Sequence, residues 1–174
     1  MNLPNKLTVL RIIMVPFFIA AYMEKWFFVA FALFIVASLT DMLDGKIARA
    51  RNLVTNFGKI MDPLADKILV YSALCLFVEN GTIPGWTLII ILAREFVVSG
   101  MRTVAASEGI VIAAAMSGKI KTVLQMVAVI ILIIAVGPVP QLKIIGMLVF
   151  WASLVMTVYS GTEYVLKNKS VFSM

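Results

Sequence analysis

Histidine is absent from the 174 residues, and the sequence holds a single cysteine, Cys75. The first absence excludes histidine general bases and histidine-ligated zinc. The second excludes an internal disulfide and any cysteine-based metal cluster. Cys75 lies in an apolar run, where we expect it to pack inertly. Any chemistry of this chain must therefore rest on its few charged and hydroxyl side chains.

Charged residues are also scarce. They make up 14% of the chain, against 62% hydrophobic residues, and the mean hydropathy is +1.04. A soluble domain is about one quarter charged, so this composition indicates lipid as the solvent. Six apolar stretches of roughly 20 residues would use about 120 residues. We therefore expect a single membrane domain over residues 1–174, with only short loops.

The apolar stretches predict an all-α membrane protein with six transmembrane helices. They are expected at about 7–23, 26–51, 60–78, 86–106, 120–136 and 142–166, with turns at 24–25, 79–85 and 137–140. The second stretch starts as an apolar run that is too short to cross, so its helix must continue through polar residues. Arg11 lies inside the first helix, and we expect its side chain to snorkel to the near interface.

The net charge of +6 could indicate nucleic-acid binding, but its distribution favours a membrane explanation. With a cytoplasmic N-terminus and six crossings, all lysines and arginines except Lys25 and Lys143 fall on the inner side. Basic residues gather on that side of membrane proteins. Every charge inside a predicted helix also lies near its cytoplasmic end. We expect cytoplasmic termini, a polar cavity open to the cytoplasm, and no nucleic-acid partner.

Four aspartates are concentrated in one segment. Asp41 and Asp44 are three residues apart, and Asp62 and Asp66 are four apart, so each pair shares one face of its helix. Four carboxylates that converge near a membrane require counter-charge, which hard divalent cations supply. Their number suits two ions that clamp phosphoryl oxygens, and Mg²⁺ and Mn²⁺ fit equally well. A helix cap would account for Asp62 alone.

The same segment carries the longer pattern D-x2-D-G-x2-A-R-x8-G-x3-D-x3-D. Its fixed positions are Asp41, Asp44, Gly45, Ala48, Arg49, Gly58, Asp62 and Asp66. The pattern resembles that of the CDP-alcohol phosphatidyltransferase family, whose members move a phosphatidyl group from CDP-diacylglycerol to an alcohol and release CMP. Together with the six-helix layout, the resemblance covers the whole chain.

The resemblance implies a role for each fixed position. The ligands of two divalent metal ions would be Asp41, Asp44, Asp62 and Asp66. The CDP site would contain Asp44, Gly45, Ala48, Arg49 and Gly58. The early pattern Asn5-x2-Thr8-x2-Arg11, which resembles a branch of the same family, would add Asn5 and Thr8. Gly45 and Gly58 would let the nucleotide approach the backbone closely. Asp66 would also be the general base that takes the proton of the acceptor hydroxyl. Finally, the family implies a homodimer.

A second group of polar residues lies later in the chain. It consists of Arg94, Glu95, Ser99, Arg102, Lys119 and Lys121. Arg94 and Arg102 are two helical turns apart and fall close to one face. Two guanidiniums and two ammoniums predict an anion site, which favours a phosphorylated acceptor. Inner-side charge alone explains Lys119 and Lys121 adequately. It explains Arg94 poorly, because apolar residues flank it.

The segment AREFVVSGMR, with GKIKT downstream, resembles the phosphatidylglycerophosphate synthase branch of the family. The resemblance implies sn-glycerol 3-phosphate as the acceptor. Phosphatidylinositol-phosphate synthase, which also needs a phosphate pocket, is the alternative within the family. A cation-coupled transporter is the alternative of another class. It would place charges near the membrane midplane and interrupt paired helices with Gly or Pro, and the sequence has neither pattern.

Overall fold

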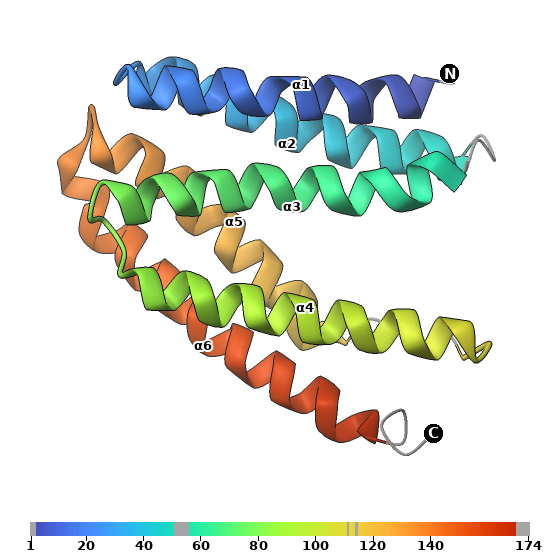
Figure 1. Ribbon diagram of the computed structural model, residues 1–174. Helices are drawn as coiled ribbons and strands as arrows, with labels where there is room; N and C mark the ends of the chain where they lie inside the picture. Colours follow the sequence, from blue (N-terminus) through green and yellow to red (C-terminus); the bar gives the residue numbers. More distant parts are fainter. Residues whose placement is uncertain (1–2, 51–55, 111, 114, 170–174) are drawn as a thin grey trace. The chain divides into compact units, whose positions relative to one another are not determined.

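The computed structural model describes residues 3–50, 56–110, 112–113 and 115–169, with side chains at 5–40, 61, 64–65 and from 67 onward within these ranges. The described residues form α-helices without a β-strand (Figure 1). The helices are α1 (Leu3–Met23), α2 (Phe27–Ala50), α3 (Asn56–Glu79), α4 (Gly85–Ser107), α5 (Met116–Val136) and α6 (Lys143–Lys167), with the 3₁₀ turn η1 (Pro140–Leu142) before α6. The all-α prediction is confirmed.

Several helices extend into polar residues beyond their apolar runs. As predicted, α2 continues past its apolar run to Ala50. α1 begins at Leu3 and α3 at Asn56, each four residues earlier than predicted. Pro4 is tolerated near the start of α1 because the first-turn N–H groups have no intrahelical partner. The helix boundaries are therefore set by backbone hydrogen bonding rather than by hydropathy alone.

The helices have the length and composition of a membrane protein. They contain 21 to 25 residues, which is roughly 32–38 Å at about 1.5 Å per residue and exceeds the roughly 30 Å hydrocarbon core. Within the described ranges, three helical stretches are also apolar enough to cross. They are Asn5–Met23, Met116–Val136 and Pro140–Lys167, with a shorter apolar stretch at Phe27–Thr40.

The turn between α1 and α2 is tight, as predicted. The N–H groups of Glu24 and Trp26 donate to Ala20 O (2.9 Å) and Ala21 O (2.8 Å). Lys25 between them has a φ of 62°, in the left-handed region. That conformation costs a residue with a Cβ roughly 1–2 kcal/mol, so glycine is the usual occupant. Lys25 therefore makes this turn less stable than a glycine at the same position would.

The turn between α3 and α4 is also where the sequence predicts it. Gly81 has a φ of 71°. The N–H of Thr82 donates to Phe77 O (2.8 Å) and to Asn80 Oδ1 (3.0 Å). The side chain of Asn80 thus serves as a local acceptor for a backbone that is turning.

The chain divides into two compact units. Unit 1 comprises Met1–Thr82 and Val129–Lys143, and unit 2 comprises Ile83–Ala128 and Ile144–Met174. In unit 1, α1 packs against α2 and α3 (Figure 1). Phe18 and Phe34 are fully buried in it, with ring centroids 5.7 Å apart.

The end of α5 belongs to unit 1 and fits closely against α2. A Cβ at Gly137 would overlap the ring of Phe27. Only glycine lets the backbone pass at this distance. Gly137 therefore fixes where α5 ends against the first residue of α2.

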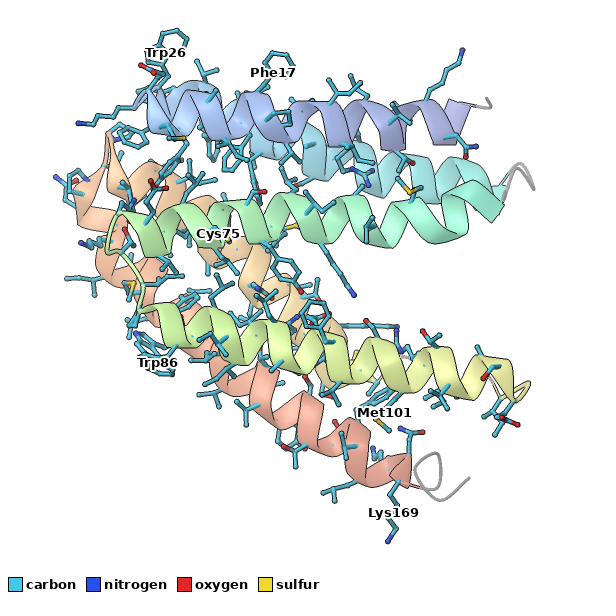
Figure 2. All side chains as sticks on the ribbon, viewed as in Figure 1. Phe17, Trp26, Cys75, Trp86, Met101 and Lys169 are labelled. Carbon is cyan, nitrogen blue, oxygen red and sulfur yellow. The ribbon has the colours of Figure 1, made fainter. Side chains whose placement is uncertain are left out.

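Several large apolar side chains are exposed and several polar ones are buried, a distribution that suits a lipid environment. Phe17 and Trp26 point outward (Figure 2), and Trp26 is 63% exposed. Conversely, Arg11, Thr8, Lys121 and Gln125 are buried. Soluble proteins show the opposite pattern. Cys75 is a free thiol and is exposed on α3.

Candidate functional site

The four aspartates lie on two helices of unit 1. Positions 41 and 44 fall in the last turns of α2, and positions 62 and 66 fall in the first turns of α3. Helical geometry puts each pair of positions on one face. Their donor set of four carboxylates fits hard divalent cations, which prefer oxygen ligands.

The side chains of the eight-position aspartate motif lie outside the described residues. These are Asp41, Asp44, Gly45, Ala48, Arg49, Gly58, Asp62 and Asp66. Among the described side chains, no group of three or more His, Cys, Asp or Glu residues has the arrangement of a metal site. The metal-ligand prediction for the aspartates therefore rests on their helix positions and chemistry.

Three polar residues of α1 are buried beside α2. Asn5, Thr8 and Arg11 recur at every third position and are all buried, with Arg11 fully so (0% exposed). The Nε of Arg11 donates to Ala37 O (3.2 Å), one turn before position 41. The snorkelling prediction for Arg11 is wrong, because its guanidinium is held inside unit 1 by this contact. Ionisable residues buried within membrane helices are typical of functional sites.

Unit 2 contains a largely buried cluster in which one carboxylate pairs with two cationic side chains. Arg94 Nη1 donates to Glu95 Oε1 (2.9 Å). Lys121 Nζ donates to the same oxygen. Glu95 and Lys121 are buried, and Arg94 is largely so. Glu95 thus holds the cationic side chains of α4 and α5 close together at one carboxylate oxygen.

Arg94 occupies a notch between α5 and α6. Its Nη2 donates to Ser160 Oγ (3.1 Å). A Cβ on Gly161 would lie 2.8 Å from Arg94 Cγ, and one on Gly118 would lie 3.4 Å from Nη2. The Nε of Arg94 is buried and has no hydrogen-bond partner among the described atoms. The guanidinium is thus fixed in position while one donor stays available to a ligand.

The remaining predicted acceptor residues are more exposed. Arg102 Nε donates to Tyr164 OH (3.2 Å), and its Cζ lies 5.4 Å from the Tyr164 ring centroid. The backbone position of Arg102 is about 12 Å farther along α4 than that of Arg94, at about 1.5 Å per residue. Ser99 is half-buried and Lys119 is exposed. The structure therefore brings Arg94, Glu95 and Lys121 together and anchors Arg102 separately.

Sequence reasoning identified Lys121 on α5 but missed the other polar residues that share its face, and it missed the polar face of α6. The buried polar residues are Ser117, Lys121 and Gln125 on α5, and Ser153, Thr157, Ser160 and Tyr164 on α6. Each set recurs every three or four residues, a helical spacing that was available as a signal within the apolar runs. Ser117 Oγ also donates to Glu163 Oε2, and Lys167 Nζ donates to Glu163 Oε1 (2.6 Å). These contacts join α5 to α6.

The family profile of CDP-alcohol phosphatidyltransferases matches residues 1–159. With this aspartate pattern and a match over most of its length, the chain belongs to the CDP-alcohol phosphatidyltransferase family. The chain is 42% identical to a CDP-diacylglycerol–glycerol-3-phosphate 3-phosphatidyltransferase of Bacillus subtilis (strain 168), over 96% of this chain and 95% of the relative.

Two further relatives carry the name of the same enzyme or of a phosphatidylglycerophosphate synthase. The enzyme with the same name from Rickettsia felis is 37% identical over 98% of this chain and 97% of the relative. A probable phosphatidylglycerophosphate synthase of Mycobacterium tuberculosis (strain ATCC 25618 / H37Rv) is 38% identical over 95% of this chain and 81% of the relative. The family recognised from the sequence motif is confirmed.

Proposed function

We propose that this protein transfers the phosphatidyl group of CDP-diacylglycerol to sn-glycerol 3-phosphate, giving phosphatidylglycerophosphate and CMP in phospholipid biosynthesis. The observation that carries this proposal is the 42% identity, over 96% of the chain, to a relative named for that reaction. The buried Arg94–Glu95–Lys121 arrangement supports a phosphate-bearing acceptor.

The donor is assigned to unit 1. Two divalent ions, Mg²⁺ or Mn²⁺, would be held by Asp41, Asp44, Asp62 and Asp66. When bound, they would neutralise the donor diphosphate. The CDP portion would contact Asn5, Thr8, Asp44, Gly45, Ala48, Arg49 and Gly58. The burial of Asn5 and Thr8 on α1, in the unit that carries the aspartates, supports their place in this set.

The reaction is a substitution at phosphorus. The hydroxyl oxygen of the acceptor attacks the β-phosphorus that carries diacylglycerol, and the bond from this phosphorus to the CMP oxygen breaks. The electron pair of that bond leaves with CMP. The Asp66 carboxylate accepts the hydroxyl proton. Positioning of the hydroxyl next to phosphorus supplies much of the rate gain.

The acceptor phosphate is assigned to unit 2. Its contacts would come from Arg94, Ser99, Arg102, Lys119 and Lys121, with Glu95 fixing the geometry of two of these cations. Two buried donors without a partner among the described atoms, Arg94 Nε and Gln125 Nε2, support an anionic ligand here. Buried polar groups normally find a partner, and the ligand would provide one.

We also propose the placement of the protein in the cell. Six transmembrane helices would leave both termini and the active-site cavity on the cytoplasmic side, as the distribution of basic residues favours. A single membrane domain is supported by the family match, which runs through both units. The family also favours a homodimer.

The test is an acceptor panel. Purified protein receives CDP-diacylglycerol, Mg²⁺ or Mn²⁺, and radiolabelled sn-glycerol 3-phosphate, inositol 1-phosphate or serine. We expect labelled lipid with glycerol 3-phosphate only, and CMP release that requires the added metal. Product with inositol 1-phosphate alone would favour the alternative synthase. Absence of CMP release under all conditions would favour a transporter. An Asp62→Asn variant serves as the inactive control.

A further inference from the structure

A cavity of about 450 Å³ lies in unit 1 at the end away from the aspartates. It is lined by the ends of α1, α3 and α5 and the start of α2, through Tyr22, Met23, Lys25, Phe27, Leu76, Glu79, Asn80 and Val136. On α3, Glu79 is about 25 Å from position 62, at about 1.5 Å per residue. The cavity is therefore separate from the site assigned to the donor.

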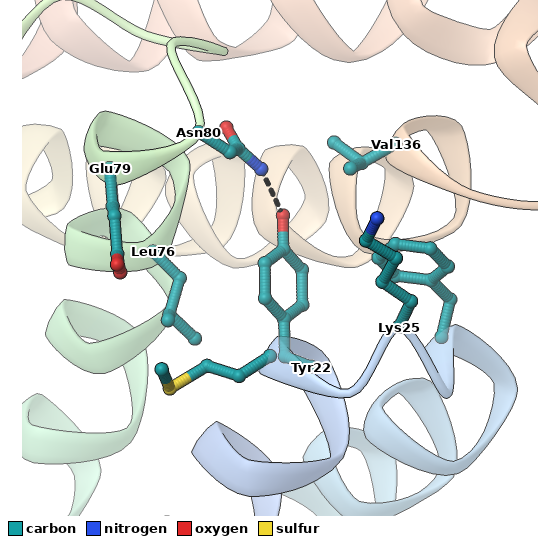
Figure 3. Close-up of a pocket in the computed structure, with 8 residues that line it drawn as sticks. Tyr22, Lys25, Leu76, Glu79, Asn80 and Val136 are labelled. Carbon is teal, nitrogen blue, oxygen red and sulfur yellow. Dashed lines mark hydrogen bonds between the residues drawn. The ribbon is translucent and has the colours of Figure 1, made fainter.

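Tyr22, which lines the cavity, is fixed by a hydrogen bond and by aromatic contacts. Tyr22 is buried, and its hydroxyl accepts a hydrogen bond from Asn80 Nδ2, which ties α1 to the end of α3 (Figure 3). The Tyr22 ring also packs edge-on against Phe27 and Phe77. Rigid aromatic walls of this kind make a preformed apolar surface.

Two opposite charges line the same cavity without meeting. Lys25 and Glu79 lie on opposite sides of Tyr22 (Figure 3). Within the described part of the chain, neither side chain has an ion-pair partner. The cavity thus offers a cation on one side, a carboxylate on the other and an apolar wall, which includes Leu76 and Val136, between them.

The backbone at Lys25 gives an independent reason to assign a role to its ammonium. This residue adopts the left-handed φ of 62°, where glycine would be relaxed. Backbone strain of this kind clusters at ligand-binding and other functional sites, so it supports a ligand at the turn that carries Lys25. The neighbouring Trp26 is exposed, as an indole in the interfacial belt of a membrane would be.

We propose that this cavity binds the headgroup of a zwitterionic phospholipid, with the lipid phosphate on Lys25, the headgroup ammonium on Glu79 and an acyl chain against Leu76, Phe27 and Val136. The charge pair selects the class of lipid. An anionic headgroup would satisfy Lys25 but bring a negative charge to Glu79. The site is distinct from the transfer reaction and would anchor the helix ends at the outer interface.

The test measures lipid retention. Wild-type protein and variants are purified in detergent and incubated with equal amounts of phosphatidylethanolamine and phosphatidylglycerol carrying the same acyl chains. Native mass spectrometry then counts each bound lipid. The informative variants are Lys25→Gly and Glu79→Gln, because Lys25→Gly removes the ammonium while relaxing the backbone. Lys143→Gln, a lysine of unit 1 outside the cavity, is the matched control.

We expect wild type to retain phosphatidylethanolamine in preference to phosphatidylglycerol. Each cavity variant should lose that lipid by about threefold to fivefold, the size of an exposed charge contact. The control should bind as wild type does. Lys25→Gly should unfold at a temperature no lower than wild type and keep its transferase activity, so lost lipid would not reflect misfolding. Equal retention by wild type and both variants would overturn the proposal, as would equal binding of the two lipids by wild type.

Discussion

At the scale of single residues, the chemistry depends on how a few polar side chains are held. Arg94 shows this most clearly. Its guanidinium contacts Glu95 and Ser160, and its aliphatic part crosses α6 at Gly161. Every one of these contacts restricts the rotamer of a long side chain, which otherwise loses up to about 2 kcal/mol of conformational freedom on binding. Preorganisation of this kind favours phosphate recognition.

The Gly161 contact gives a direct prediction. In Gly161→Ala the added methyl would lie 2.8 Å from Arg94 Cγ, so the guanidinium must shift. We expect the KM for glycerol 3-phosphate to rise by about tenfold, or about 1.4 kcal/mol, with a smaller change in the KM for CDP-diacylglycerol. Steady-state kinetics in detergent micelles measures both.

Gly100→Ala is the matched control for this variant. Gly100 lies on α4, and a Cβ there would meet no heavy atom within 4 Å. The control should keep wild-type kinetics and gain up to about 1 kcal/mol in stability from helix propensity. If both alanine variants behaved alike, the notch around Arg94 would have no role in acceptor binding.

The proposed base can be separated from the metal ligands at the same scale. Asp66→Asn keeps the size of the side chain but removes its proton affinity. General-base removal typically lowers turnover by about 10²–10⁴-fold, and we expect a loss in that range. Turnover is measured as CMP release at saturating metal. A variant that kept its metal affinity and most of its turnover would show that Asp66 is only a ligand.

At the scale of helices, the sequence predicted the positions of the helices well and the burial and contacts of their side chains poorly. Hydropathy and turn residues located all six helices to within about four residues. Burial could not be predicted in the same way. Arg11 was assigned to the interface because an isolated helix leaves it no other partner, whereas Ala37 of α2 provides one. An apolar run likewise does not tell which of its residues are buried, and Cys75 is exposed on α3 although apolar residues flank it.

The candidate site was also predicted in part. The helical spacing predicted that Arg94 and Arg102 act together, but the two guanidiniums have different partners. Arg94 contacts Glu95 and Ser160. Arg102 contacts Tyr164. A periodic pattern identifies a shared face, not a shared contact. The polar residues of α6 were missed because serine and threonine, which bond their own helix carbonyls, weaken an apolar run only slightly.

The junction of α5 with α2 supplies a prediction for a whole element. Gly137→Ala places a methyl group in overlap with Phe27 Cδ2, so either the Phe27 ring or the end of α5 must move. Overpacking of this kind costs about 1–3 kcal/mol, which lowers the unfolding temperature in detergent. The double variant Gly137→Ala/Phe27→Ala should recover part of the loss because the ring is gone. Additive losses would mean that the two positions are not in contact.

At the scale of the whole molecule, orientation in the membrane is testable because the chain has one cysteine. In a Cys75→Ala background, single cysteines are introduced at Glu24 and Lys169, both exposed. A membrane-impermeant maleimide added to intact cells should label Glu24→Cys only, since basic residues stay inside. Lys169→Cys should be labelled only after permeabilisation. The reverse pattern would invert the proposed topology.

The shared contact of Arg94 and Lys121 with Glu95 has a consequence for the response to ionic strength. One negative charge offsets one of two positive charges, so this triad keeps a single excess positive charge. Mobile ions screen exposed charges over about 8 Å at physiological salt, but they do not enter a buried cluster. If Arg102 and Lys119 attract the acceptor as proposed, added salt should weaken that attraction, because both side chains are exposed. It would leave almost unchanged the interaction of the buried triad with the acceptor phosphate that we propose it binds.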